Sequence, residues 1–232
     1  MRKIGFFGGF DKTDFIMYIA RILVEMGEKV ILIDASLMQK ARYIIPTMEK
    51  SKSYVTNFEG IDVAIGFENI DAIKKHLGVP PTLDLSYDIA LINLDTPEGA
   101  INYEFGTYEQ NYFTTTFDLY SIRKAIEVLE VLQAPIQAYK IFFTKQGSKE
   151  ESDYIDYVTE GKKVEWNDEI LYLPFELGDQ TVIYNNQRVS KIKFKRLSNQ
   201  YKTGLMYVTA KIQPNASEGM VKHAFKKIEK GV

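Results

Sequence analysis

The sequence predicts an α/β fold, a single domain built on a doubly wound, mainly parallel β-sheet. Its apolar runs are continuous and do not alternate with polar residues, which is typical of strands covered on both faces. Segments with apolar residues at helical spacing separate these runs, and alternation of strand and helix favours parallel crossover units. The length of 232 residues fits one such domain.

The expected elements follow one another along the chain with short connections. Strands are expected over residues 3–7, 29–33, 89–94, 136–144 and 169–173. The first two flank an apolar helix over 15–26 that a glycine ends, and a later amphipathic helix is expected over 119–132. The stretch 35–80 is less regular, with short helices expected around Pro46 and before a Pro-Pro pair.

Composition excludes several kinds of site. No run approaches about 18 consecutive apolar residues, so no membrane-spanning helix is expected. The chain has no cysteine, and its two histidines, His76 and His223, are far apart in sequence, which argues against disulfides and the common metal sites. The basic start leads directly into an apolar strand without a cleavage site, so we expect no signal peptide and a cytoplasmic chain.

The formal net charge of −2 is the balance of two unlike regions. From Arg188 to the end there are eleven Lys and Arg residues against two acids, whereas the first 187 residues carry a balance of −11. Such asymmetry favours contact of the C-terminal region with an anionic partner, although a solvated mixed surface would look the same.

A glycine loop joins the first expected strand to the first helix. It contains Gly8 and Gly9, then Asp11, Lys12 and Thr13 at the start of the helix. Glycines let backbone N–H groups turn toward an anion, and a helix N-terminus adds a favourable potential. Lys12 could reach the β- and γ-phosphates of a nucleotide and Thr13 could ligate Mg²⁺. The alternative is a Gly-Gly turn in which Asp11 caps the helix.

Polar groups end the later strands. Asp34 closes an apolar run about 20 residues after the glycine loop, Asn93 and Asp95 close another, and 171–176 ends in a proline turn. In this order and spacing, the motifs resemble the MinD/ParA family of deviant Walker-motif P-loop ATPases over essentially the whole chain. The resemblance extends to the branch of the pilus-assembly proteins TadZ and CpaE, which includes members with altered motifs.

The resemblance implies a set of site residues. ATP or ADP with Mg²⁺ would be held by Gly8, Gly9, Asp11, Lys12, Thr13, Asp14 and Asp34, with Thr13, Asp34 and Asp95 at the metal. The adenine-contacting asparagine of the family falls near Thr144, in the run that continues to Lys145. No catalytic residue is assigned.

Four positions depart from the family pattern. Phe7 replaces the signature lysine that crosses the family's dimer, and Asp11 replaces the third glycine of the loop. Ser36 replaces the acid that positions the attacking water, and Asn93 replaces the magnesium-linked aspartate. A like charge at about 4 Å costs about 4 kcal/mol at an effective dielectric of 20, so Asp11 should weaken phosphate binding. Losing these groups should leave hydrolysis very slow or absent.

Three readings of the nucleotide pocket remain open from the sequence: nucleotide binding without turnover, a scaffold that binds no nucleotide, and a slow ATPase. We expect a degenerate MinD/ParA-like protein that positions or organises a cellular assembly, such as a pilus or secretion system, through protein contacts. The alternative is an active ParA-type ATPase for plasmid or chromosome partition. A homodimer would need a source of stability other than the signature lysine.

The C-terminal region suggests two further partners. Residues 188–202 carry six Lys or Arg residues, no acid, and the aromatic residues Phe194 and Tyr201, a composition that could contact DNA nonspecifically. After a main domain over 1–213, residues 220–232 form a basic amphipathic helix that could lie on an anionic membrane surface. The alternative for this helix is docking on the domain core.

Overall fold

The computed structural model describes residues 1–48, 51–144, 149–174 and 176–230. These residues form one eight-stranded sheet in the order β3-β4-β2-β5-β1-β6-β7-β8, parallel except for the antiparallel edge pair β3 and β4. The strands are β1 (Arg2–Phe7), β2 (Val30–Asp34), β3 (Tyr54–Phe58), β4 (Ile61–Ile65), β5 (Ile89–Leu94), β6 (Gln110–Thr115), β7 (Ile136–Phe142) and β8 (Val164–Tyr172). The doubly wound, mainly parallel sheet is confirmed.

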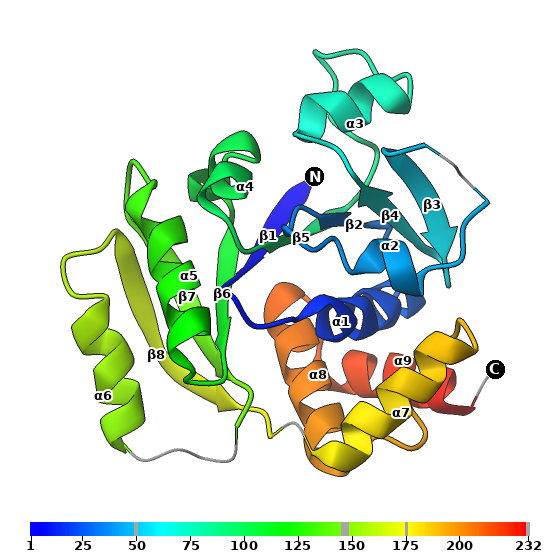
Figure 1. Cartoon of the computed structure of the whole chain (residues 1–232). Helices are drawn as coiled ribbons and strands as arrows, with labels where there is room; N and C mark the ends of the chain where they lie inside the picture. Colours follow the sequence, from blue (N-terminus) through cyan, green and yellow to red (C-terminus); the bar gives the residue numbers. More distant parts are fainter. Residues whose placement is uncertain (49–50, 145–148, 175, 231–232) are drawn as a thin grey trace.

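Helices cover both faces of the sheet, each over its own apolar core. One core joins the sheet to α1 (Thr13–Glu25), α7 (Leu177–Arg188), α8 (Asn199–Ile212) and α9 (Glu218–Lys230), which gather beside one another in Figure 1. The other joins it to α3 (Ile70–His76), α4 (Pro97–Asn102), the 3₁₀ turn Phe105–Thr107, α5 (Leu119–Glu130) and α6 (Lys149–Val158). The single turn α2 (Ala41–Ile44) precedes Pro46.

Two parts of the sheet were not expected from the sequence. The hairpin β3–β4 turns at Glu59 and Gly60, both with positive φ, a conformation usually signalled by Asn-Gly or Asp-Gly. Strand β6 was missed because polar side chains interrupt its apolar pattern, and Asn111, Thr114 and Thr115 are nevertheless buried. After Pro46 the described residues contain no helix before β3, so the short helix expected there was wrong.

The C-terminal helix α9 is docked on the core. Val221, Ala224 and Phe225 are buried against α1 and α8, and the ring of Phe225 packs edge-on against Phe194 with centroids 5.1 Å apart. Lys227 adds an ion pair of 2.6 Å to Glu25 of α1. The apolar face that would contact a membrane surface is therefore covered by protein. In this structure the helix is docked on the domain core, the second of the two alternatives.

No helix in the described part of the chain is long and apolar enough to cross a membrane.

Candidate functional site

The carboxyl ends of three adjacent strands bring the expected site residues together. Strand β5 lies between β1 and β2, and the pairing sets Asp34 of β2 beside Asn93 of β5. The glycine loop leaves the end of β1 directly beside them and leads into α1. Ligands of open α/β sheets bind at such strand ends, so this edge is the candidate site.

A cavity of about 340 Å³ opens over the glycine loop. It is lined by Gly9, Phe10, Asp11, Lys12, Thr13, Ser36, Met38, Lys40, Tyr43, Asn93, Asp95 and Tyr120. The lining thus contains most of the residues expected from the sequence, together with side chains from the irregular stretch after β2 and from the start of α5.

The two glycines of the loop are required by packing. Gly8 has a φ of +122°, and a Cβ there would lie 2.4 Å from the carbonyl oxygen of Thr114. A Cβ on Gly9 would lie 2.9 Å from the Cα of Ser121, and the N–H of Gly9 already donates to the carbonyl of Ser121 at 3.3 Å. Close approach to β6 and α5 therefore accounts for both glycines without a bound anion.

The loop lysine is folded back into the protein. Lys12 is 2% exposed and its ammonium donates to the carbonyl oxygen of Gly8 at 2.9 Å. Burial lowers the pKa of Lys12 to about 8, against the opposing effect of nearby Asp95, Asp11 and Asp34. The ammonium group that would contact a phosphate is instead hydrogen-bonded to the backbone of the loop.

The carboxylate of Asp11 lies at the start of α1. Its Oδ1 accepts the backbone N–H of Thr13 at 3.1 Å, and its Oδ2 accepts from the ammonium of Lys40 at 2.6 Å. Burial alone would raise the pKa of Asp11, but Lys40 and the hydrogen bonds from Thr13 outweigh it and hold this pKa below its ordinary value. An internal anion thus occupies the helix N-terminus where the fold would accept a phosphate.

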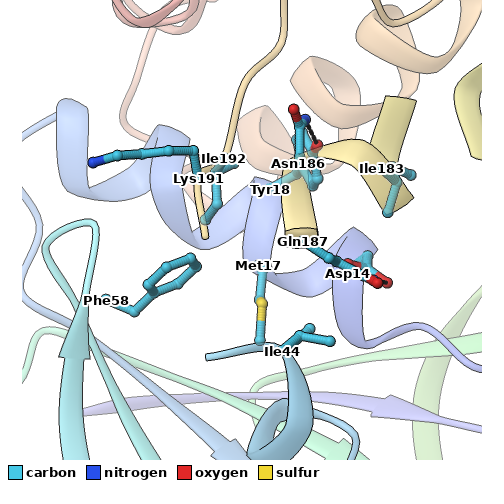
Figure 2. A pocket seen from close by; sticks show the side chains of 10 residues that line it. All are labelled: Asp14, Met17, Tyr18, Ile44, Phe58, Ile183, Asn186, Gln187, Lys191 and Ile192. Atoms are coloured by element: carbon cyan, nitrogen blue, oxygen red, sulfur yellow. Dashed lines mark hydrogen bonds between the residues drawn. The ribbon is translucent and has the colours of Figure 1, made fainter. Parts of the chain in front are cut away.

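Lys40 ties Asp11 to a second acid and to α7. The same ammonium donates to Asp14 at 2.7 Å, and Gln187 of α7 donates to both oxygens of Asp14 at 2.9 Å. Figure 2 shows Gln187 directed toward Asp14, and both residues line a small void of about 20 Å³, room for about one water. The loop is therefore braced from two elements distant in sequence.

Asp34 and Asn93, at the ends of neighbouring strands, are hydrogen-bonded to each other. The amide nitrogen of Asn93 donates to Asp34 at 3.2 Å and to the hydroxyl of Thr13 at 3.3 Å. Asp34 also accepts from Ser36 at 2.5 Å and from the N–H of Ala41 at 3.0 Å. Burial holds the pKa of Asp34 above its ordinary value, against the opposing effect of the hydrogen bonds from Ser36 and Ala41.

Asp95 lies half-buried on the cavity wall and accepts the N–H of Leu37 at 2.8 Å. Within the described ranges, no group of three or more His, Asp or Glu side chains is placed to hold a metal ion. The helix N-terminus, Lys12 and Asp34 each have an internal partner. A magnesium nucleotide would have to displace these partners.

Aromatic rings occupy the neighbourhood of the expected adenine contact. Phe10 of the loop stacks on Phe143 with centroids 4.4 Å apart and an angle of 27° between the rings. Thr144 follows Phe143 directly, and Lys145 lies outside the described residues. A second cavity of about 240 Å³, beyond Asp11, is lined partly by these rings and by Tyr184.

Phe7, at the position of the family's signature lysine, is buried. Phe7 is 0% exposed and packs on the rings of Phe105 and Phe113, with centroid distances of 5.2 and 5.6 Å. It lies in the core beneath β1 and not at a surface that could reach a second subunit.

Several residues of the site had no signal in the sequence. Lys40, Gln187 and Tyr120 carry no motif, and Lys40 meets its partners across 26 and 29 residues of chain. The apolar spacing that predicts helices does not report such contacts.

The basic region expected at 188–202 is divided by the structure. Lys191 and Lys202 pair with Glu59 and Glu229 at 3.0 and 2.6 Å. Lys193, Lys195 and Arg196 instead line a groove of about 430 Å³ with residues of α7, and none of the residues that line it is an acid. We call this the basic groove.

No protein-family model matches the sequence, and no curated protein matches it. Solved structures do match. MinD in the MinC:MinD cell division complex of Aquifex aeolicus has a TM-score of 0.56 at 13% identity, over 94% of this chain and 97% of that one. An AMPPNP-bound protein of Borrelia burgdorferi B31 assigned to plasmid partition has a TM-score of 0.54 at 10% identity, over 91% and 100%.

The ParA protein of pNOB8 bound to nonspecific DNA has a TM-score of 0.51 at 13% identity, over 93% of this chain and 100% of that one. At these identities the likeness concerns the fold and not the chemistry of the site. The chain therefore has the fold of the MinD/ParA-type P-loop ATPases, with an internal set of contacts in place of the open phosphate loop.

Proposed function

We propose that this chain is a pseudo-ATPase of the MinD/ParA type, which neither binds nor hydrolyses ATP and organises or positions a cellular assembly through protein contacts. Within that class we propose a localisation factor for a pilus or secretion-type assembly. MinD in complex with MinC is an example of this fold in a protein complex.

One observation carries the proposal: the carboxylate of Asp11 accepts the N–H of Thr13 at the start of α1. A phosphate would have to displace this carboxylate and also break its ion pair with Lys40. At about 4 Å and an effective dielectric of 20, each pair of like unit charges costs about 4 kcal/mol. This repulsion opposes nucleotide binding at the position that the fold would use.

The groups that would act in hydrolysis support the same proposal. Ser36 donates its hydroxyl to Asp34 and is a poor base for an attacking water. Asn93 carries no charge for Mg²⁺, and the buried Phe7 cannot supply a cation to a second subunit. Phosphoryl transfer depends on positioned charge, so these replacements argue against an active partition ATPase.

The test is titration of the full chain with a fluorescent ATP analogue, with and without Mg²⁺. We expect no saturable binding below about 1 mM. Phosphate release should equal that of the Lys12→Ala variant. Micromolar binding that Lys12→Ala abolishes, or release well above this control, would contradict the proposal.

A polyanion such as duplex DNA is a second candidate partner, since the basic groove is lined by three cations and no acid. Contact with an anionic membrane through 220–232 is less well supported, because Val221, Ala224 and Phe225 would have to leave the core. Neither contact requires the cavity over the glycine loop.

A further inference from the structure

The cavity over the glycine loop carries an excess of negative charge. Asp11 and Asp95 line it together with Lys12 and Lys40. The excess comes from two more carboxylates directly behind the wall, Asp14, which is bonded to Lys40, and Asp34, which is bonded to Asn93. Lys124, which is also near Asp95, is paired with Glu127 at 2.7 Å. The cavity is therefore charged to receive a cation.

An unpaired acceptor in the cavity lining points to the same kind of ligand. Asn93 lines the cavity and is 2% exposed, and its Oδ1 accepts no hydrogen bond from any described residue. Rotating the amide would turn this oxygen toward the carboxylate of Asp34, so the orientation is fixed by charge. A buried acceptor without a partner is costly, and a ligand that donates hydrogen bonds would satisfy it.

The rim of the cavity is apolar and exposed. Met38, Tyr43 and Tyr120 line it and are 74, 79 and 63% exposed, and Leu37 beside them is 71% exposed. Large apolar side chains gathered around a polar cavity are typical of a binding surface for another protein. The tyrosine rings can also pack against a cation.

We propose that this cavity is a docking site for a partner protein, which inserts an arginine or lysine side chain flanked by apolar residues. The inserted group donates to Asp95 and Asn93, and the flanking residues pack on Met38, Tyr43 and Tyr120. A volume of about 340 Å³ lies within the usual range of ligand pockets, about 300–1,000 Å³. The partner thereby takes the place that the fold gives to a nucleotide.

Charge argues for a different protein and not for a second copy of this chain. In a two-fold dimer through this face, the same patch would meet itself, and two acidic cavities would oppose each other. The inference rests on the proposed function in one respect, namely that no nucleotide fills the cavity.

Two matched peptides test the proposal: acetyl-Leu-Arg-Leu-amide and the same peptide with neutral citrulline in place of arginine. Amide NMR shifts of the full chain are followed up to about 10 mM peptide. We expect saturable shifts at cavity residues with the arginine peptide only. Asp95→Asn should weaken this binding about tenfold, as expected for loss of a charge-assisted hydrogen bond. Glu218→Gln, an exposed acid on α9, is the control and should bind as the wild type does.

The outcomes separate this inference from the proposed function. Equal shifts with both peptides, or none at the cavity, would overturn the docking site while leaving the pseudo-ATPase intact. Saturable shifts of cavity residues with magnesium-ATP would overturn both. If sedimentation shows a dimer and the cavity amides are covered in it, the occupant is a second copy and the proposed partner is wrong.

Discussion

The cavity over the glycine loop and the basic groove differ in the sign of the charge that they can accept. The cavity lies at the carboxyl ends of β1, β2 and β5, where this fold has its anion site, yet the four carboxylates at and directly behind its wall outnumber Lys12 and Lys40. The groove lies beside α7 and is lined by Lys193, Lys195 and Arg196 without an acid. The backbone of the fold fixes where a site lies, whereas a few side chains decide which ligand fits it.

The two regions also differ in what holds them. The loop is held by polar contacts, chiefly those of Asp11, Lys12 and Lys40. The basic groove is held by apolar packing, because Phe194, between two of its lysines, is buried against Tyr18 and Phe225. Substitutions should therefore separate the two regions cleanly.

The largest effect is expected from Phe225→Ala, which removes the ring beneath the basic groove. Large-to-small changes of a buried phenylalanine cost about 3–5 kcal/mol, and we expect about 3 kcal/mol in urea unfolding. Met220→Ala on the same helix is the control, because Met220 is exposed, and its cost should stay below about 0.5 kcal/mol. Equal costs for the two variants would show that α9 is not docked as described.

The next effect concerns the sign of charge at the loop. Asp11→Gly removes the internal anion from the start of α1. The φ of Asp11 is not positive, so the glycine relieves no backbone strain and the change tests the charge. We expect the affinity for a fluorescent ATP analogue to rise at least about tenfold, since a repulsion of up to about 4 kcal/mol is removed. Asp11→Asn, which keeps the side-chain volume, should give part of this gain. No gain from either variant would mean that Asp11 does not oppose phosphate.

A smaller effect is expected in the pH dependence of stability. The pKa of Lys12 is about 8 in the folded chain against 10.5 when unperturbed, so between these values the unfolded state binds more protons. Stability must then rise with pH through this window, by about 1.5 kcal/mol from pH 8 to about 9.5. Urea unfolding at several pH values should show this rise in the wild type relative to Lys12→Met. A constant difference between the two would contradict the burial of a charged Lys12.

The smallest effect is expected at the basic groove. Arg196→Gln should weaken binding of a short DNA duplex about threefold at low salt, as expected for one exposed charge. Lys226→Gln on α9 is the matched control, because Lys226 is exposed and does not line the groove. If both variants weaken binding equally, the contact is diffuse and the groove is not the site.

The sequence predicted those elements whose structure is determined by the residues of one continuous segment. Strands β1 and β5 are continuous apolar runs, and the glycine loop between β1 and α1 carries its own motif. Strand β6 was not predicted because its buried Asn111 and Thr114 donate hydrogen bonds to the distant residues Gln137 and Phe7, which local hydropathy does not show.

The sequence predicted which residues of the candidate site lie together, but not the partners that they contact. Gly8, Gly9, Lys12 and Thr13 lie where the motif sets them, and Asp34 and Asn93 meet them as parallel strand ends must. The ion pairs of Lys40 could not be predicted, because they join an irregular loop to α1 across 26 and 29 residues. Those pairs hold the carboxylates of Asp11 and Asp14 at the start of α1.

The burial of Phe7 has a consequence for how this chain can change. Its ring fills the core between Phe105 and Phe113, so a lysine introduced at this position would leave an ammonium group among aromatic rings. An unpaired charge in such a place destabilises a fold by several kcal/mol. A lysine at this position that could reach a second subunit therefore requires replacement of the surrounding rings as well, and no single substitution provides it.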